Sequence, residues 1–458
     1  MKAKRILSLL LCLAMVFSMG ALVSCGDDST QGKQDGDKAD TFMPEDLNIT
    51  VWGAFGEDYW DNWTRDFPEV NLDHSTSTDN NLATLAAAIA AQNPPDMFYT
   101  QSSEKAPLGE AVAKNLVQPL DEYFTRDPEY TKDDLPEWFD LFVTFPDKNG
   151  EEHIYAIYTD VSVSCLVWNK DLFEAAGLDR DTPPKTWSEM QDFSKKLTKY
   201  DASGMVSQAG FMDYTWWFQH WRLTYGDSYQ NRYTGEVNVV DDDGKFKSVL
   251  EFLMSFPASY GGADKIAEGV EWSKGNVAMG VADVGYGQKL ANDFEIGLAP
   301  LPYNDDAKYG LTAPTVAGYA NQWYGIPVGA KNPDGGWLFA RWASTLGSMY
   351  IQEGDALKNP ETWNPVYLVH KPTKNMLFDM YLDGAREDVR ANLQKREEIY
   401  DQINFDRPVN APINADFEVQ IQTTCSNIVS GILPVTDGLN EIQSIGEMLY
   451  KMYQDDIA

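Results

Sequence analysis

Carboxylates and aromatic rings are the side chains of this sequence whose chemistry is suited to holding a ligand. The chain contains 70 Asp and Glu residues, 14 Trp and 23 Tyr. An ionised carboxylate accepts hydrogen bonds from two neighbouring hydroxyls, and Trp or Tyr offers a large rigid face at little cost in conformational entropy. A carbohydrate presents hydroxyls at its edges and C–H groups on its faces. The composition is therefore consistent with carbohydrate binding.

Asp160 is the strongest single candidate for a ligand-binding carboxylate. It lies inside an extended apolar run from Tyr155 to Trp168, where an aspartate is costly unless something pairs with it. A ligand hydroxyl would pair with it. The alternative is an aspartate that is hydrogen-bonded to nearby backbone.

Further candidates lie where two expected strands end. Trp52 closes the short β-rich run Leu47–Trp52, and Tyr99 and Gln101 close and follow a second short strand. Open α/β sheets bind ligands at the carboxyl ends of their strands, so these three side chains are expected to line a site. Glu57, in the loop after Trp52, is a further candidate, although such a carboxylate is more often a solvated surface charge.

Net charge excludes one class of partner. Lys and Arg number 36 against 70 Asp and Glu, which gives a net charge of −34 and an isoelectric point of about 4.3. Phosphate binding needs a basic surface that releases counterions, so no nucleic-acid partner is expected. Anionic lipid head groups are disfavoured on the same grounds.

Metal and enzyme motifs give no positive signal. The four His residues are scattered without metal-ligand spacing, and no HExxH, phosphate loop or serine-nucleophile elbow occurs. Asp241–Gly244 lacks the spacing of a twelve-residue calcium loop and is better interpreted as a turn before a helix. No cofactor, no metal and no catalytic residue are expected.

Strands and helices alternate in a way that predicts an α/β fold. The strand Leu47–Trp52 is followed by a helix over Asn81–Gln92 and a strand over Asp96–Tyr99, and this alternation implies parallel sheets flanked by helices. Thr186 and Glu189 predict a capping box at a helix start. From residue 375 onward the chain is expected to be mostly helical, and its 458 residues suggest two or three domains.

The N-terminus has the layout of an export signal. Met1–Arg5 carries three basic residues, an uncharged apolar run follows over Ile6–Val23, and residues 22–25 (LVSC) resemble a bacterial lipobox. This resemblance implies a lipoprotein signal peptide over 1–24 and a lipidated Cys25, with palmitate among the expected acyl chains. A plain cleaved signal or an uncleaved anchor is the alternative. Residues 25–46, polar and rich in Gly and Asp, are expected to form a flexible tether.

Cysteine usage leaves one question open. With Cys25 lipidated, a single intramolecular disulfide between Cys165 and Cys425 is possible. Both lie in apolar surroundings, which favours two buried thiols.

Three segments resemble the extracellular solute-binding proteins of ABC transporters, the large family that contains maltose-binding protein. Each is similar to a family motif, and they occur in the family's order. They are residues 155–158 leading into 167–173 (VWNKDLF), residues 274–280 (KGNVAMG) leading into 296–302, and residues 323–327 (WYGIP) with 330–333 and 337–339. Together with the lipobox they span nearly the whole chain.

The resemblance implies a two-lobed, periplasmic-binding-protein-like α/β fold of type II, with a ligand cleft between the lobes and a helical C-terminus. The first lobe would comprise 47–158 and 315–358, and the second 159–314 and 359–458. It also implies a monomer that captures an oligosaccharide by hinge closure and delivers it to the permease of an ABC transporter, without catalysis. The protein would be lipid-anchored at Cys25 on the extracellular face of the bacterial membrane.

The resemblance also implies site residues. Asp160 falls where maltose-binding protein places an acidic sugar ligand. The other implied ligand-binding residues are Asp213, Trp216, Trp217, Tyr286, Asn321 and Trp323. Adjacent tryptophans cannot both face inward, so one of Trp216 and Trp217 is expected to be core. Tyr286 is displaced by one position from the family's stacking Trp, and Trp323 is equally compatible with packing inside the lobe.

Other functions are weighed against this interpretation. A secreted glycoside hydrolase would share the acidic, tryptophan-rich composition, but it needs two carboxylates at a fixed separation. A solute-binding protein for a cationic ligand such as a polyamine would use carboxylates and aromatic rings as a cage. A surface protein that only captures glycans is a third alternative. Chain length and the segments at 274–280 and 296–302 favour the sugar-binding interpretation.

Overall fold

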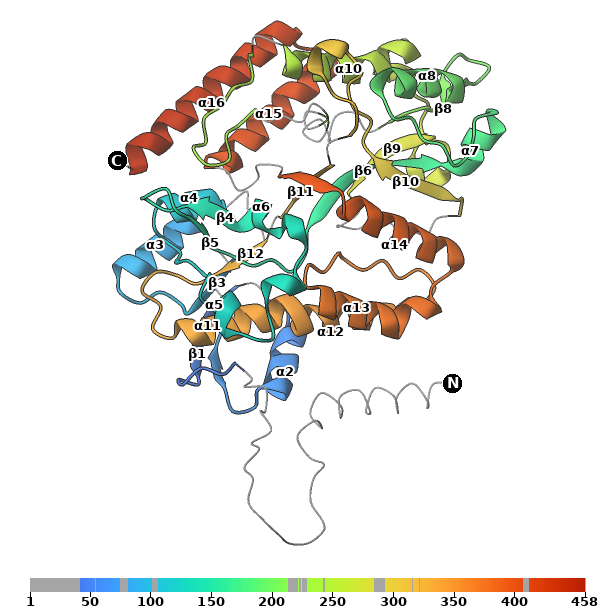
Figure 1. Cartoon of the computed structure of the whole chain (residues 1–458). Coiled ribbons are helices and arrows are strands. Elements are labelled where there is room, and N and C mark those ends of the chain that lie inside the picture. The colour runs from blue at the N-terminus through green and yellow to red at the C-terminus, as the bar shows by residue number, and fades with distance from the viewer. Residues whose placement is uncertain are drawn as a thin grey trace.

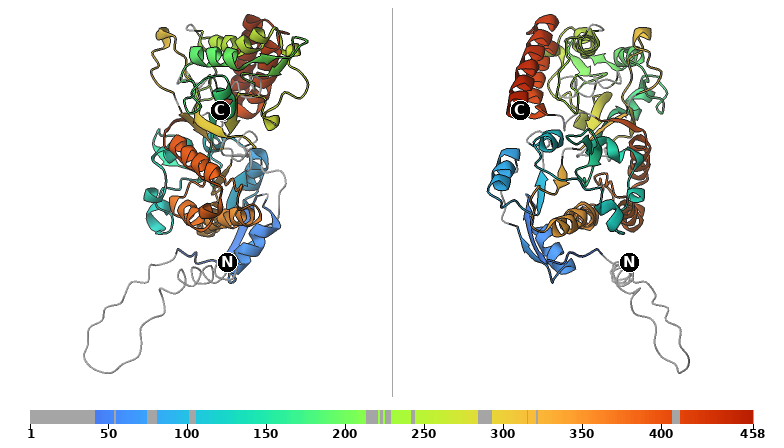
Figure 2. Two further views of the ribbon diagram at one scale, coloured as in Figure 1. Left: turned by 90° about the vertical axis from the view of Figure 1, so that its right-hand side faces the viewer. Right: turned by 60° about the vertical axis from the view of Figure 1, so that its left-hand side comes forward.

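The computed structural model describes residues 42–457 apart from 54, 75–80, 101–105, 213–220, 222–223, 225–228, 242–243, 284–292, 315, 321 and 407–411. Two main β-sheets organise these residues, one in the lower half of Figure 1 and one above it. Figure 2 shows the same arrangement from two other sides, with the first strands and the C-terminal helices at opposite ends.

The lower sheet is built from the expected β–α–β alternation. Strand β1 (Asn48–Trp52) pairs in parallel with β2 (Asn71–Asp73) and β3 (Met97–Thr100), and β12 (Trp323–Gly325) adds to β3 in antiparallel orientation. Helices α2 (Glu57–Asp66) and α3 (Leu82–Ala90) make the two crossovers. Asn81 caps α3 by accepting a hydrogen bond from the backbone N–H of Thr84.

The upper sheet separates two cores. Its central strand β6 (Ser162–Asn169) pairs with β9 (Met279–Asp283), β10 (Ile296–Pro300) and β11 (Val316–Tyr319), and β13 (Ile403–Asp406) pairs with β11. Side chains alternate along a strand. Val163, Cys165 and Val167 therefore join the core shared with the lower sheet, whereas Leu166 and Trp168 join the core above.

The remaining elements cover these sheets. The longer helices are α8 (Trp187–Leu197), α10 (Lys245–Tyr260), α11 (Pro333–Trp342), α12 (Ser348–Lys358), α13 (Lys371–Tyr381), α14 (Glu387–Tyr400), α15 (Asn414–Val429) and α16 (Val435–Ile457). The shorter ones are α4 (Leu108–Ala113), α5 (Tyr123–Arg126), α6 (Asp140–Val143), α7 (Lys170–Ala175), the 3₁₀ turns Lys132–Asp134, Glu137–Phe139, Ala263–Lys265, Trp272–Lys274, Ala307–Tyr309 and Leu382–Gly384, and the π-helical turn Ala343–Gly347. Two hairpins pair β4 (Thr144–Pro146) with β5 (Glu152–Ile154) and β7 (Lys199–Tyr200) with β8 (Val206–Gln208).

Helix packing distinguishes the two halves. In the upper half α10 packs against α8, α15 and α16, and Trp187 stacks on Phe252 at 4.1 Å. In the lower half α11 packs on β1 and β3, and α12 packs on α13. Helix α14 instead packs on β10 and β11. The expected boundary at residue 358 assigns α13 to the second lobe, whereas α13 packs on α12, which the same boundary assigns to the first lobe. The boundary stays a prediction.

Packing begins earlier in the chain than expected. Phe42 is buried; its ring lies edge-on to Tyr123 at 6.2 Å, and the Arg126 guanidinium lies over it at 5.4 Å. The body of the protein therefore includes residues ahead of Leu47. Cys165 and Cys425 are both buried thiols and belong to different hydrophobic clusters. Within the described ranges, no helix combines the length and the apolar character that a membrane span requires.

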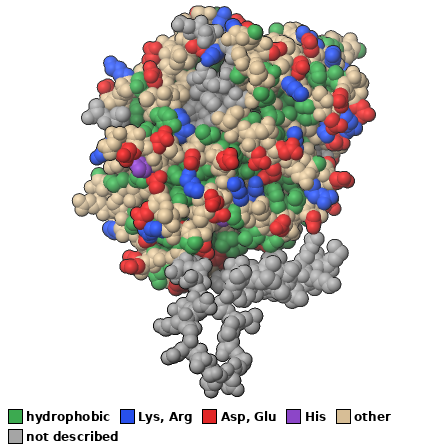
Figure 3. Space-filling view, viewed as in Figure 1, with side chains coloured by type: hydrophobic (Ala, Val, Ile, Leu, Met, Phe, Trp, Pro, Cys, Tyr) green, Lys and Arg blue, Asp and Glu red, His purple; other side chains and the backbone are tan. Residues whose placement is uncertain are grey.

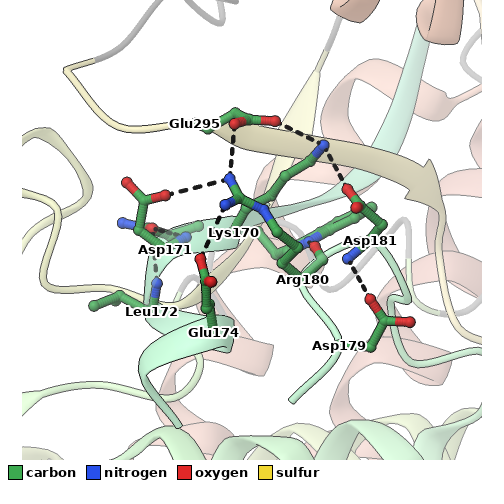
Figure 4. Close-up of polar contacts among 10 residues, drawn as sticks. Lys170, Asp171, Leu172, Glu174, Asp179, Arg180, Asp181 and Glu295 are labelled. Atoms are coloured by element: carbon green, nitrogen blue, oxygen red, sulfur yellow. Dashed lines mark hydrogen bonds and ion pairs between the residues drawn. The ribbon is translucent and has the colours of Figure 1, made fainter. Parts of the chain in front are cut away.

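An ion-pair network anchors α7, the helix of the VWNKDLF segment. Asn169 caps this helix by accepting hydrogen bonds from two backbone N–H groups. Lys170 binds Glu295 at 3.0 Å and Asp181 at 2.8 Å, and Arg180 binds the same Glu295 at 2.7 Å, as Figure 4 shows. Glu295 immediately precedes β10. The segment that carries much of the family resemblance thus positions a helix.

Candidate functional site

Asp160 lies where the chain passes from the lower to the upper sheet. The segment 157–160 bridges Tyr324 on one side and Leu368 on the other, and β6 begins at Ser162. The Asp160 residue is only 5% exposed. A buried carboxylate therefore stands at the junction of the two sheets, where a hinge between lobes would lie.

A cluster of aromatic rings lies beside the crossing segment, which Tyr324 contacts at Ile157 and Thr159. Tyr99, at the end of β3, stacks on Tyr324 of β12 at 4.6 Å and on Phe55 at 4.7 Å. Phe55 also contacts Tyr59 of α2 at 5.2 Å. We call Phe55, Tyr59, Tyr99 and Tyr324 the tyrosine cluster. Tyr99 and Tyr324 lie on strands β3 and β12, Phe55 lies in the loop after β1, and Tyr59 lies on α2, so the lower sheet and the helix after β1 position the cluster.

The hydroxyls of the tyrosine cluster are held by hydrogen bonds. Tyr99 donates to the side-chain oxygen of Gln322 at 2.6 Å. The Tyr324 hydroxyl lies 2.9 Å from the Thr159 hydroxyl, and that of Tyr59 lies 3.0 Å from the Ser348 hydroxyl. Tyr99 and Tyr324 are buried and Phe55 and Tyr59 are half-buried, so the fixed hydroxyls and stacked rings form a rigid, packed cluster.

The electrostatics link these tyrosines to Asp160. Burial raises the pKa of Tyr99 and Tyr324 well above the usual value for tyrosine, and the charge of Asp160 adds to the shift. Burial likewise raises the pKa of Tyr59, and Asp160 again contributes. All three hydroxyls therefore stay protonated near neutral pH. The cluster is neutral and polar at its hydroxyls, with one carboxylate beside it.

Gly53 makes the position of Phe55 possible. A Cβ atom at residue 53 would lie 2.4 Å from the Phe55 ring and 3.1 Å from the Cβ of Tyr99. Only a glycine lets the ring of Phe55 rest on the end of β1. The loop that follows β1 is thereby directed toward Tyr99.

Three other predicted residues lie near or within this part of the lower sheet. Trp52 is half-buried at the end of β1, and Glu57 is exposed at the start of α2. Trp323 is fully buried, packs on Phe98 at 5.3 Å and donates its indole N–H to the carbonyl of Ala106 at 2.8 Å. Trp323 is thus packed inside the lobe, which is the alternative that the sequence left open.

Six predicted residues lie outside the described part of the chain. They are Gln101, Asp213, Trp216, Trp217, Tyr286 and Asn321. Of the eleven predicted binding residues, the structure therefore brings together Asp160 and Tyr99, with Trp52 in the same sheet and Glu57 on the adjoining helix. The binding role of every one of them stays a prediction.

Sequence reasoning missed Tyr59 and Tyr324. Tyr324 follows Trp323 on β12, and alternation sends the two rings to opposite faces of the sheet. Both rings are buried, and the packing shows that Trp323 contacts Phe98 whereas Tyr324 stacks on Tyr99. Tyr59 lies in the first turn of α2. The rule that ligands bind at the carboxyl ends of strands therefore did not indicate it.

One group of side chains has the composition of a metal site. Asp147, Glu151 and His153, at and beside the β4–β5 hairpin, offer ligand atoms within 4.8 Å of one another. Asp147 already accepts hydrogen bonds from the backbone N–H groups of Asn149 and Glu151, which close the turn. This group therefore serves the hairpin and lies away from the tyrosine cluster.

Surface charge does not single out a binding face. Figure 3 shows acidic side chains distributed over the whole of the face it presents, with Lys and Arg among them. Some of the described salt bridges are local pairs, such as Lys114 with Glu110 and Arg126 with Glu122. On the face shown in Figure 3 the negative charge is spread and is not gathered in one patch.

Two sheets joined by crossing segments define a two-lobed, periplasmic-binding-protein-like α/β protein. The family model described as bacterial extracellular solute-binding protein matches residues 48–349. The chain belongs to this family, which is a family of binding proteins and not of enzymes. The predicted fold class and the predicted absence of enzymatic activity are confirmed by this membership.

Curated relatives match parts of the chain. The sn-glycerol-3-phosphate-binding periplasmic protein UgpB of Pectobacterium atrosepticum is 26% identical over 268 residues, which are 54% of this chain and 55% of that protein. UgpB of Escherichia coli K12 is 30% identical over 172 residues, 34% of this chain and 37% of that protein. The chain thus spans about half or less of the length of these relatives.

Solved structures share the fold over most of the chain. CpMnBP1 with mannotriose bound has a TM-score of 0.59 at 20% identity and covers 87% of this chain and 99% of its own. UgpB from Mycobacterium tuberculosis in complex with glycerophosphocholine also has a TM-score of 0.59, at 17% identity, and covers 88% of this chain and 98% of its own. At these identities the likeness shows the fold alone.

Proposed function

We propose that this protein captures an oligosaccharide between its two lobes and delivers it to the permease of an ABC transporter. The observation that carries the proposal is the pairing of a buried carboxylate, Asp160, with the tyrosine cluster at the junction of the two sheets. Carboxylates bind sugar hydroxyls, and rigid aromatic rings cover the faces of the sugar. Membership in the solute-binding family supports capture and transfer without chemistry.

A phosphate ester of glycerol is the second candidate, because the curated relatives are named for sn-glycerol 3-phosphate. Phosphate is recognised by Lys, Arg and backbone N–H groups. The contacts of the tyrosine cluster involve aromatic rings, hydroxyls and the amide oxygen of Gln322, with the Asp160 charge nearby. That charge would repel a phosphate, so these residues support a neutral polyhydroxylated ligand.

The protein is further proposed to be held at the extracellular side of the bacterial membrane by lipid on Cys25. The LVSC segment supports lipidation, and a diacyl-type modification holds a protein on a membrane stably, whereas a single chain does not. In cells that export the protein, C25S is expected to move it from the membrane fraction to the soluble fraction. Retention of C25S in the membrane would contradict the lipid anchor.

Isothermal titration calorimetry of the full-length mature protein tests the ligand. Linear and branched oligosaccharides, sn-glycerol 3-phosphate and a polyamine such as spermidine are titrated in parallel. Heat and saturation are expected with an oligosaccharide. Saturable binding of glycerol 3-phosphate alone would transfer the proposal to the second candidate, and binding of the polyamine alone would remove the sugar.

A further inference from the structure

A hairpin-like loop of the upper half reaches the lower half. It runs through residues 229–240, and in Figure 1 it is the yellow-green segment that descends beside α16 toward α6 and β4. The loop is bonded firmly to its own half. Gln443 of α16 accepts a hydrogen bond from the Val239 N–H at 2.7 Å and donates to the Val237 carbonyl at 3.1 Å.

The tip of this loop is also pre-formed. The Asn231 side chain accepts hydrogen bonds from the backbone N–H groups of Tyr233 at 2.9 Å and Thr234 at 3.0 Å. Gly235 has a φ of 80°, and a Cβ atom there would lie 3.1 Å from Pro412. The tip is therefore held in a fixed shape by hydrogen bonds within its own loop.

Arg232, at this tip, bonds to backbone of the lower half. Its guanidinium donates to the carbonyl of Leu141 in α6 and to that of Thr144 at 3.2 Å. These carbonyls stand at the C-terminal end of α6, where helix carbonyls lack intrahelical partners and a cation is favoured. The guanidinium also lies over the Phe145 ring at 4.8 Å.

Tyr233 adds an aromatic contact between the same two elements. Its ring lies edge-on to Phe145 at 6.0 Å, and the Arg232 guanidinium lies 4.9 Å from the Tyr233 ring as well.

We propose that Arg232 and Tyr233 form a latch that stabilises the lobe arrangement of this structure against rotation of one lobe relative to the other. The latch rests on the hinge closure proposed above. Rotation about the crossing segments moves the rigid tip away from α6, because the tip is bonded to α16. Both guanidinium bonds and both ring contacts are then lost together.

The latch is tested by measuring the distance between the lobes without ligand. Spin labels are attached at D61C on α2 and E251C on α10 in the full chain carrying C25S, and the distance distribution is recorded by pulsed electron paramagnetic resonance. Hydrogen bonds to a charged group are strong enough for R232A to change the ratio of lobe arrangements by roughly tenfold. R232K, which keeps the charge without the two-pronged geometry, is expected to give a smaller change.

Two further variants keep the test decisive. Y233S removes a ring that is 43% exposed, so it is expected to fold and to shift the distribution in the same direction as R232A. R386A is the matched control, since Arg386 pairs with Asp388 two residues away, and its distribution is expected to equal that of the parent. Identical distributions in the parent, R232A and Y233S would overturn the latch. Because no ligand is present, failure of sugar binding leaves this result unaffected.

Discussion

At the scale of single residues, Asp160 is the side chain on which the proposed ligand binding depends most. Its carboxylate is buried at the passage between the sheets and acts on three tyrosines of the lower lobe. An ionised carboxylate at this junction can accept hydrogen bonds from ligand hydroxyls. If Asp160 instead only holds the backbone of the crossing segment, its replacement is expected to leave the affinity for the ligand unchanged.

D160A is expected to weaken oligosaccharide binding by roughly 1.5–3 kcal/mol, the range for a hydrogen bond to a charged group. Titration calorimetry of D160A and D160N measures the change. D61A, which removes an exposed aspartate from α2, serves as the control and is expected to bind like the parent. Unaltered affinity in D160A would assign Asp160 to the backbone of the crossing.

His370 gives a prediction for stability against pH. Its imidazole is buried, stacks on Tyr130 at 5.1 Å and lies 2.7 Å from the Thr373 hydroxyl. Burial lowers its pKa to about 4 from the ordinary 6.5. Between these values the unfolded chain binds more protons, so stability is lost as pH falls from about 6.5 to about 4, by no more than about 3 kcal/mol.

Thermal unfolding from pH 7.5 to pH 4 tests this assignment. Carboxylates titrate in part of the same range, so the comparison is between the parent and H370Q. The decrease in melting temperature with acidification is expected to be smaller in H370Q. Equal slopes would show that His370 is not the group responsible.

At the scale of elements, the end of β1 decides whether the tyrosine cluster forms. Gly53 leaves room for Phe55, and Phe55 stacks on Tyr99. Helix α2 then begins at Glu57 and brings Tyr59 to the same place. The short loop between β1 and α2 therefore places Phe55 and Tyr59 in the cluster that is proposed to bind ligand.

G53A is expected to displace Phe55 and to destabilise the fold by about 1–3 kcal/mol, as overpacking does. Weaker ligand binding is expected with it. G56A is a close control, because nothing lies within 4 Å of a Cβ atom at residue 56. Urea unfolding and titration calorimetry of both variants measure the difference, and similar behaviour of the two would contradict the proposed role of Gly53.

At the scale of the whole molecule, the lower and upper hydrophobic cores support different parts of the protein. The tyrosine cluster adjoins the core of the lower half, and the upper core packs α8 and α10 with the C-terminal helices. The rings of nine tryptophans are buried, namely Trp63, Trp138, Trp168, Trp187, Trp221, Trp323, Trp337, Trp342 and Trp363. The tryptophan content therefore reflects packing more than it reflects ligand binding.

Ligand is expected to draw the lobes together, because contacts from both lobes form only in the closed arrangement. Small-angle scattering with and without saturating oligosaccharide measures the radius of gyration, which is expected to decrease on binding. Sn-glycerol 3-phosphate at the same concentration is the comparison ligand. An oligosaccharide that binds in calorimetry without a decrease would contradict hinge closure.

Short-range sequence patterns predict several helix boundaries and the α/β class of the fold. Asn81, Asn169 and Thr186 cap helices through their own side chains, and Pro94 and Pro95 follow α3, so these boundaries follow from nearby residues. The α/β alternation and the ordered family segments likewise predict two lobes. Such features depend on neighbours in the chain, and the amino-acid sequence by itself determined them.

Tertiary structure alone decided which rings meet at Asp160. Phe55, Tyr99 and Tyr324 are separated by up to 269 positions, and they stack because β1, β3 and β12 are neighbours in one sheet. Trp323 and Tyr324 are both buried, and only the packing shows that Trp323 contacts Phe98 while Tyr324 stacks on Tyr99. The contact of Arg232 with α6 was likewise invisible in the sequence. Each is an interaction between distant segments, which only the packed chain brings within reach.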